Sequence, residues 1–204
     1  CGCGALMVVA LYFGSFNPPH CGHAAIAEYL HGDGGFSEVW IVLSPQNPLK
    51  DPEMLLDEGE RLGMLQAWVS EKPYLHLCTV ELEMERPSYT YLTLRRLRKE
   101  CPQFRFSVVM GADSLVRFTA WREYAEIAAN HPILVYPRDG FDAATAAAGL
   151  RREIPQADIR CLEAPLSNVS STEVRKAVLM GEDISGMVPS AVGRYIRQHA
   201  LYCQ

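Results

Sequence analysis

The sequence lacks the features that mark a membrane-spanning or a secreted protein. None of its 204 residues belong to an apolar run that approaches the length needed to cross a bilayer. The first residues, CGCGALMVVALYF, have neither the basic n-region nor the small-residue cleavage pattern of a secretory signal. We therefore expect a cytoplasmic protein without a membrane partner, and we assign no function to residues 1–4.

The sequence also lacks paired cysteine spacings. It has seven cysteines, an odd number, and no CxxC motif, which favours reduced thiols over a disulfide framework. Cys1 and Cys3 are spaced for a metal, but their place among the first residues argues against that role.

Positive charge is not in excess. With 19 basic and 24 acidic residues the formal net charge is −5, which argues against nucleic acid as a partner but allows a small basic pocket for a phosphate ligand. No repeat, low-complexity tract or linker divides the chain. We therefore expect one domain over residues 1–204.

What the sequence does contain is an alternation of strand-like apolar runs and helical patterns. The predicted strands are 5–13, 38–44, 74–80, 104–111, 132–137 and 158–164. The predicted helices are about 21–32, 56–70, 90–100, 121–129, 171–180 and 189–199. This order predicts an α/β fold with a doubly wound, mostly parallel sheet and two C-terminal helices. Ligands bind such sheets at the carboxyl ends of the strands, so we expect chemistry in the loops that follow them.

The stretch YFGSFNPPHCGHAAIA (12–27) holds the first candidate site. Gly14 lets a ligand approach the backbone closely, and two prolines stiffen the loop that leads to His20. If the next helix begins near His20, then His20 and His23 share one face of its first turn. The positive end of that helix favours phosphate, and the two imidazoles can donate hydrogen bonds to phosphate oxygens.

Two other roles for the histidine pair stay open from this stretch alone. A metal site needs at least a third ligand, yet Cys21 projects away from the shared face and no other His/Cys pair has suitable spacing. Two buried core histidines without a chemical task are the stronger alternative.

The stretch NVSSTEVRKAV predicts the start of a late helix. Ser170 and Glu173 have the spacing of a capping box. The hydroxyls of Ser171 and Thr172 would then lie at the positive helix end, where Arg175 can reach a bound phosphate. An ordinary capped surface helix with an exposed Arg175 is the alternative.

Taken together, the two stretches resemble the motifs of the HxGH nucleotidylyltransferase superfamily. The first motif of that family, Gly-x-Phe-x-Pro-x-His-x-Gly-His, is complete here at Gly14, Phe16, Pro18, His20, Gly22 and His23. The second, Ile-Ser-Ser-Thr-x-x-Arg, is matched from Val169 to Arg175 with Val in place of Ile. The resemblance implies a Rossmann-like nucleotidylyltransferase fold.

Four further segments, SPQNPLK, RPSYTYLTL, MGADSL and YPR, together with Trp121, are similar to bacterial nicotinate-nucleotide adenylyltransferases. This resemblance runs from about residue 8 to 200. It implies transfer of AMP from ATP to nicotinic acid mononucleotide, which yields nicotinic acid adenine dinucleotide and pyrophosphate for NAD biosynthesis. Mg²⁺ is expected to arrive with ATP, ligated mostly by water and phosphate, so no dedicated protein cage for a metal is expected. Whether copies of the chain associate is left open.

The resemblance also implies roles for individual residues. The expected catalytic residues are His20, His23 and Arg175. The expected ATP- and phosphate-binding residues are Gly14, Ser15, Phe16, Lys50, Gly111, Asp113, Ser170, Ser171 and Thr172. The expected mononucleotide-binding residues are Asn47, Tyr89, Thr90 and Trp121, where the indole can stack on a pyridine ring.

Several of these residues have an ordinary structural alternative. Asp113 suits the N-cap of a helix, and so do Tyr89 and Thr90. Trp121 suits a partly buried aromatic contact, and Lys50 suits a solvated surface. Two positions also depart from many relatives, because Leu49 stands in place of a histidine and Asn17 in place of an aspartate.

Other functions remain as alternatives. One is a sister adenylyltransferase that acts on nicotinamide mononucleotide or on phosphopantetheine. Trp121 and Thr90 disfavour phosphopantetheine because a flexible thiol arm has no ring to stack. Another is a nucleotide-binding module without catalysis, which the intact set of His20, His23 and Arg175 disfavours.

Overall fold

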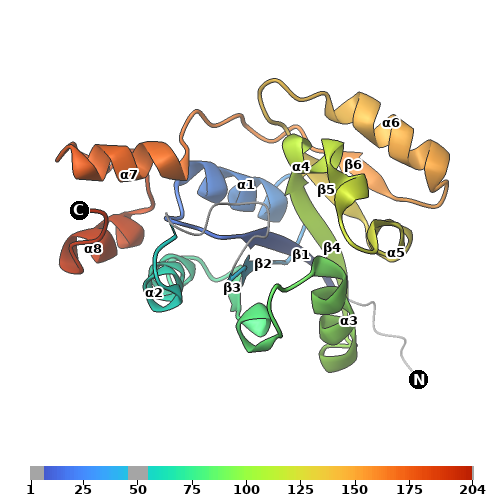
Figure 1. The fold of residues 1–204 in the computed structure, drawn as a ribbon, viewed down its shortest axis with the longest axis horizontal. Helices are drawn as coiled ribbons and strands as arrows, with labels where there is room; N and C mark the ends of the chain where they lie inside the picture. Colours follow the sequence, from blue (N-terminus) through green and yellow to red (C-terminus); the bar gives the residue numbers. More distant parts are fainter. Residues whose placement is uncertain (1–6, 46–54, 204) are drawn as a thin grey trace.

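Six parallel strands form the sheet at the centre of the computed structural model, which describes residues 7–45 and 55–203 (Figure 1). The strands are β1 Met7–Gly14, β2 Glu38–Leu43, β3 Leu75–Cys78, β4 Phe104–Gly111, β5 Ile133–Tyr136 and β6 Ile159–Cys161. Their order is β3-β2-β1-β4-β5-β6, and each neighbouring pair is parallel. The predicted doubly wound sheet is confirmed.

Strand β1 occupies the middle of the sheet because it is apolar on both faces. Its residues Val9 to Leu11 are fully buried, as expected for a parallel strand that is covered on both sides. Val9 lies opposite Glu38 of β2 on one side and opposite Phe106 of β4 on the other. The strand order reverses between β1 and β4, so the ends of these two strands flank the crevice where such sheets bind ligands.

Helices cover both faces of the sheet. On one face lie α1 Cys21–His31, α2 Glu58–Val69, α7 Ser171–Leu179 and α8 Ser190–Gln198. On the other face lie α3 Thr90–Glu100, α4 Ala112–Val116, α5 Tyr124–Asn130 and α6 Ala143–Glu153. The described residues also form the short 3-10 helices η2 Val80–Glu83 and η3 Phe118–Ala120. Within the described ranges, no helix has both the length and the apolar character to cross a membrane.

The helices differ from the sequence prediction in two regions. Helices α4 and α6 were not predicted; α6 is rich in alanine, and its buried residues are only Ala147 and Leu150, which leaves a weak periodic signal. The helix predicted over 121–129 begins later, at Tyr124. Glu123 before it has a φ of 56°, in the left-handed region, which separates α5 from η3.

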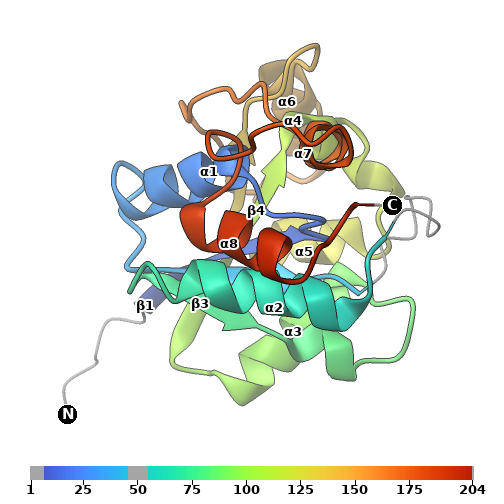
Figure 2. The ribbon, with the colours of Figure 1, turned by 90° about the vertical axis from the view of Figure 1, so that its left-hand side faces the viewer.

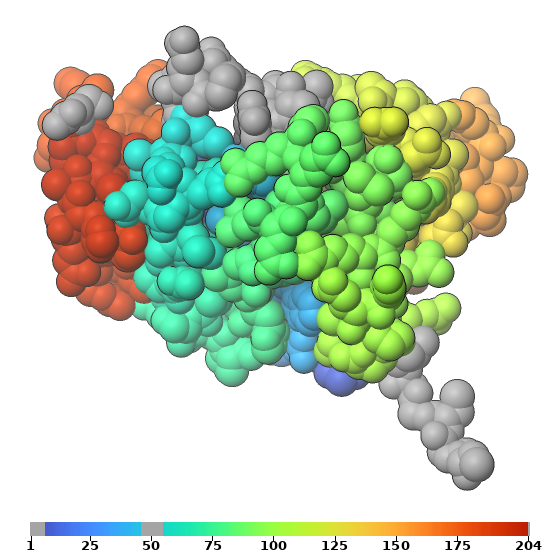
Figure 3. All heavy atoms as spheres, turned by 60° about the horizontal axis from the view of Figure 1, so that its bottom comes forward, coloured from blue at the N-terminus to red at the C-terminus, as the bar shows by residue number. Residues whose placement is uncertain are grey.

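The last helix, α8, packs beside α2, as the ribbon and the space-filling view both show (Figures 2 and 3). Gly63 of α2 is the point of close approach, because a Cβ there would lie 2.0 Å from the hydroxyl oxygen of Tyr195. That hydroxyl donates to Glu60 at 3.1 Å, and its ring stacks on His199 with the centroids 4.0 Å apart. Tyr195 is therefore not free to move aside.

We predict that Gly63→Ala lowers the free energy of unfolding by about 1–3 kcal/mol, the usual cost of overpacking. Gly149→Ala is the matched control, since Gly149 also lies in a helix but a Cβ there meets nothing within 4 Å. The control should gain up to about 1 kcal/mol from the better helix propensity of alanine. Urea unfolding measures both, and a Gly63→Ala protein as stable as the control would contradict the packing described here.

Candidate active site

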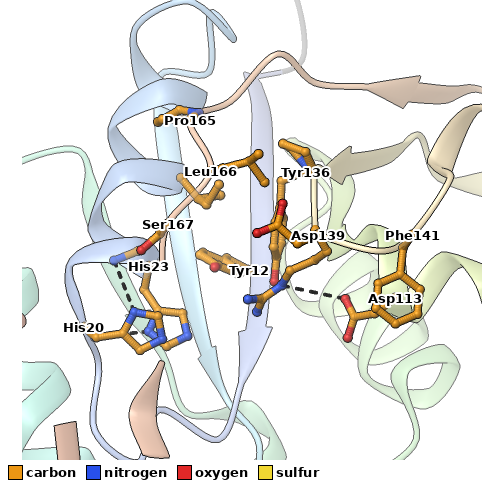
Figure 4. Close-up of a pocket in the computed structure, with 14 residues that line it drawn as sticks. Tyr12, His20, His23, Asp113, Tyr136, Asp139, Phe141, Pro165, Leu166 and Ser167 are labelled. Carbon is orange, nitrogen blue, oxygen red and sulfur yellow. Dashed lines mark hydrogen bonds and ion pairs between the residues drawn. The ribbon is translucent and has the colours of Figure 1, made fainter. Parts of the chain in front are cut away.

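A cavity of about 410 Å³ opens at the carboxyl ends of the central strands (Figure 4). Its lining residues are Tyr12, His20, Gly22, His23, Ile26, Asp113, Tyr136, Pro137, Arg138, Asp139, Phe141, Pro165, Leu166 and Ser167. In Figure 4, His20 and His23 form one wall, while Asp113 and Phe141 form the opposite wall. The cavity therefore lies at the reversal of strand order, where the sequence predicted the chemistry.

Helix α1 begins with two histidines that accept backbone hydrogen bonds. His20 is the N-cap, and its Nδ1 accepts from the N–H of Gly22 at 3.1 Å. The Nδ1 of His23 accepts from the N–H of His20, also at 3.1 Å. A ring nitrogen that accepts an N–H carries no proton, so each neutral ring has its proton on Nε2. The pair is built to donate hydrogen bonds, and binding a metal through Nδ1 would break the helix cap.

The two rings lie side by side, with centroids 3.7 Å apart. His20 is only 5% exposed. Its burial, and then the positive charge of Arg138, lowers the pKa of His20 to about 4, so the ring is neutral at pH 7. Since both rings line the cavity, they are not core histidines that lack access to a ligand.

Glycines at two positions let the backbone pass close to side chains that line the cavity. A Cβ on Gly22 would lie 2.7 Å from Ser167 Oγ and 2.9 Å from the His20 ring. A Cβ on Gly111 would lie 2.3 Å from Asp113 Oδ1. At Gly22 the buried His20 ring has no room to shift, so glycine is required there, whereas at Gly111 the nearest atom is the end of the Asp113 side chain, which is 42% exposed and can turn away.

Arg138 is a cavity residue that the sequence analysis did not assign to the site. Its Nε lies 3.8 Å from Asp113 Oδ1, and its guanidinium carbon lies 5.4 Å from the ring centroid of Tyr136. Among the described residues, this buried Nε has no hydrogen-bond partner, an arrangement that an anionic ligand would improve. The sequence did hold a signal, because Arg138 closely follows a buried strand at the predicted ligand edge.

Tyr12 and Tyr136 lie between the two walls and were also not predicted as site residues (Figure 4). Their ring centroids are 5.8 Å apart. Burial, and then the neighbouring Tyr136, raises the pKa of the Tyr12 phenol well above its ordinary value. Both residues belong to apolar strands, so their pattern indicated only core positions.

Helix α7 begins as predicted, with a capping box between Ser170 and Glu173. The N–H of Glu173 donates to Ser170 Oγ at 3.2 Å, and the N–H of Ser170 donates to Glu173 Oε2 at 2.7 Å. Ser171 Oγ donates to the carbonyl oxygen of Pro18 at 2.9 Å. The two motifs, which are about 150 residues apart in the sequence, therefore meet in the fold.

Arg175 strengthens that junction. Its Nη1 donates to the carbonyl oxygen of Asn17 at 2.8 Å, and its Nη2 lies 3.3 Å from Thr172 Oγ1. Its Nε is buried without a hydrogen-bond partner among the described residues. Arg175 and the three hydroxyl residues of the motif do not belong to the described lining of the cavity, so their phosphate-binding role stays a prediction.

Arg61 of α2 holds the first motif from another side, and the sequence analysis did not find it. This fully buried side chain donates through Nη1 to the carbonyl oxygens of Ser15 and Ser44, at 3.0 and 2.9 Å. Its Nη2 donates to Pro45 O at 2.8 Å and its Nε to Leu56 O at 3.1 Å. Nothing in the helical pattern of α2 marks a buried arginine, because its partners are backbone atoms of distant loops.

The remaining predicted phosphate-binding residues occupy different places. Gly14 ends β1, and Phe16 is buried with its ring centroid 5.0 Å from that of His23. Phe16 therefore supports the histidine from the core. Asp113 lies in the first turn of α4, where Gly111 is the N-cap, so the N-cap alternative for Asp113 is wrong.

Tyr89, Thr90 and Trp121, which are predicted to bind the mononucleotide, do not belong to the described lining of the cavity. Tyr89 is the N-cap of α3, and Thr90 is its first residue. Trp121 follows η3 and packs on Phe118, with ring centroids 5.4 Å apart. The guanidinium of Arg122, next to Trp121, lies 5.1 Å from the ring centroid of Tyr89. The two segments thus adjoin, while Asn47 and Lys50 lie outside the described residues.

Residues 11–177 match the model of the cytidylyltransferase-like family. This chain belongs to the cytidylyltransferase-like family. Relatives named "Probable nicotinate-nucleotide adenylyltransferase" include one from Flavobacterium psychrophilum, 34% identical over 96% of this chain and 99% of its own length. Another, from Salinibacter ruber, is 37% identical over 96% of this chain and 98% of its own length.

A solved structure supports the fold of this cytidylyltransferase-like protein. The Plasmodium falciparum nicotinic acid mononucleotide adenylyltransferase complexed with NaAD has a TM-score of 0.76 and is 20% identical in sequence. The similarity covers 97% of this chain and 98% of that one. At this level of identity, the comparison supports the shared fold.

The lowered pKa of His20 predicts a pH-dependent stability for this cytidylyltransferase-like protein. Between pH 6.5 and 4 the unfolded chain protonates this histidine while the folded chain does not. His20 should therefore reduce the free energy of unfolding by about 3 kcal/mol as the pH falls through this range.

The variant His20→Asn keeps a good N-cap but removes the titration. Urea unfolding at several pH values should show a shallower loss in this variant than in the wild type. Equal slopes for the wild type and His20→Asn would contradict the assignment.

Proposed function

We propose that this chain transfers the adenylyl group of ATP to nicotinic acid mononucleotide, which gives nicotinic acid adenine dinucleotide and pyrophosphate for NAD biosynthesis. The observation that carries the proposal is the pair of neutral histidines at the start of α1, whose Nε2–H groups belong to a cavity that Arg138 also lines. Hydrogen-bond donors and positive charge around one cavity suit a polyphosphate. The choice of acceptor follows from the names of the relatives, which are similar to this chain over nearly their full length.

The reaction needs no nucleophile from the protein. A phosphate oxygen of the mononucleotide attacks the α-phosphorus of ATP, and the bond from that phosphorus to the bridging oxygen of the β-phosphate breaks. Pyrophosphate then leaves with the bonding electrons. Positioning and charge stabilisation supply the catalysis in such transfers. His20 and His23 donate to the phosphate oxygens on which negative charge accumulates, and the positive end of α1 adds to this effect.

Arg138, which lines the cavity, and the residues predicted to bind phosphate would hold the rest of ATP. Arg138, whose Nε lacks a partner among the described residues, would pair with a phosphate or stack against the base. Arg175 and Lys50 would bind the β- and γ-phosphates. Ser171 and Thr172, at the start of α7, would hold oxygens of the leaving pyrophosphate.

Mg²⁺ bound to ATP fits the residues present. Two carboxylates, Asp113 and Asp139, line the cavity, and Mg²⁺ commonly uses one or two carboxylates together with water and substrate phosphates. Across residues 7–45 and 55–203, no group of three or more His, Cys, Asp or Glu side chains is arranged to hold a metal ion by itself. Asp113 would face the ion, and Mg²⁺ would neutralise part of the triphosphate charge when bound.

The acceptor would lie against Tyr89, Thr90 and Trp121. An indole that can stack on a flat pyridine ring favours a pyridine nucleotide over phosphopantetheine. The adjacency of the two segments, through Arg122 and Tyr89, supports a shared binding place. Asn47, which lies outside the described residues, would add a polar contact.

An assay with three acceptors tests the substrate. The protein is incubated with ATP, Mg²⁺ and either nicotinic acid mononucleotide, nicotinamide mononucleotide or phosphopantetheine, and pyrophosphate release is measured. We expect the fastest release with nicotinic acid mononucleotide and a product with the mass of the deamidated dinucleotide. Release only with one of the other two acceptors would overturn the substrate assignment.

Removing one imidazole should slow turnover strongly. His23→Ala should lower kcat by about two orders of magnitude or more, the usual effect of losing one donor to the transition state. His23→Asn should be similarly slow although its side-chain oxygen can still accept the N–H of His20, which separates catalysis from helix capping. His76→Ala serves as a surface control. Wild-type rates in either folded His23 variant would remove this residue from the mechanism.

A further inference from the structure

A buried carboxylate, Glu81, has no part in the proposed reaction. It belongs to η2, directly after β3, and is only 3% exposed. Burial raises the pKa of Glu81, and hydrogen bonds from three hydroxyl groups oppose that rise. Burying a carboxylate costs free energy unless hydrogen bonds replace its contacts with water. The three hydroxyl groups supply such hydrogen bonds to Glu81.

The contacts of Glu81 converge on the start of α3. Thr93 Oγ1 donates to Glu81 Oε1 at 2.8 Å, and Thr93 is itself fully buried. Ser88 Oγ donates to Glu81 Oε2 at 2.9 Å. The third hydroxyl is that of Ser44, just after β2. One carboxylate therefore joins η2, the end of β2 and both sides of the α3 N-terminus.

Helix α3 depends on these contacts because its own cap is weak. Its N-cap residue, Tyr89, makes no side-chain capping hydrogen bond. The hydroxyl of Thr93 lies 3.3 Å from the carbonyl oxygen of Tyr89, and the N–H of Thr93 donates to the same oxygen at 3.2 Å. Glu81 thus holds Thr93, whose N–H closes the first turn of α3. It also holds Ser88, which directly precedes the N-cap residue Tyr89.

We infer that Glu81 is a positioning residue for the acceptor mononucleotide, acting through Thr93 and Ser88 on Tyr89 and Thr90. The inference rests on the proposed function, in which Tyr89 and Thr90 bind the acceptor. Glu81 does not line the described cavity on the histidine side. Glu81 also contacts Ser44 on the phosphate side, so the test removes only the hydroxyls of Thr93 and Ser88 on the α3 side, and their loss should fall on the acceptor and spare ATP.

The variant Thr93→Val tests this inference because it keeps the shape of the side chain and removes the hydroxyl. The KM for nicotinic acid mononucleotide should rise about tenfold, as expected when one hydrogen bond that orders a binding segment is lost. The KM for ATP should stay within about twofold of the wild-type value, because the contacts of the ATP site are unchanged and distant sites couple only weakly. Thr93→Ser, which restores the hydroxyl, should return the acceptor KM toward the wild-type value.

Two further variants guard against a general loss of structure. Ser88→Ala removes the second hydroxyl at a less buried position and should raise the acceptor KM in the same selective way. Ile159→Val shortens a core residue in β6, at the far edge of the sheet from η2, and should change neither KM. Circular dichroism and thermal unfolding establish that each variant is folded.

The outcomes separate the two claims. A selective rise in the acceptor KM, restored by Thr93→Ser, supports the positioning role. An unchanged acceptor KM in folded Thr93→Val and Ser88→Ala, or an equal rise in both KM values, overturns it while the wild type still makes the dinucleotide. Absence of both turnover and calorimetric binding of nicotinic acid mononucleotide in the wild type removes the proposed function, and the positioning role with it.

Discussion

The site depends on one buried cation, Arg61, whose guanidinium donates to four backbone carbonyl oxygens. These oxygens come from the loop after β1, from the two residues that follow β2 and from Leu56, two residues before α2. A planar guanidinium with a fixed fork of donors can hold several carbonyls at set angles, which a lysine cannot do. The path of the chain into His20 is therefore fixed by an interaction that lies outside the cavity.

Ser44 links the guanidinium of Arg61 to the buried carboxylate of Glu81. Its carbonyl oxygen accepts from Arg61, and its hydroxyl donates to Glu81. A continuous polar network thus runs beneath the carboxyl ends of the strands, from the histidine loop to the start of α3. Each member has its partner, which is the condition under which buried polar groups order a structure. The network gives the phosphate side and the proposed acceptor side of the site a common support.

The sequence predicted those features that depend on neighbouring residues. The apolar run of β1, the capping box at Ser170 and Glu173 and the position of His20 at a helix start are local patterns, and all are confirmed. Arg61, Arg138 and Glu81 were not predicted as parts of the site. Their partners lie in distant segments, and a charged residue in one segment carries no signal of what it will contact. Arg138 is the exception that sequence could have found, from its place after β5.

The histidine pair shows why folding and chemistry cannot be separated at this site. Each Nδ1 is occupied by a backbone N–H of the helix start, and this contact places the ring proton on Nε2. The hydrogen bonds that begin α1 are therefore the same ones that select the donor tautomer. The low pKa of His20 keeps that tautomer neutral near pH 7. In the proposed reaction, neutral donors would bind and release a highly charged pyrophosphate without a change of protonation, whereas a charged imidazolium would hold the product more tightly.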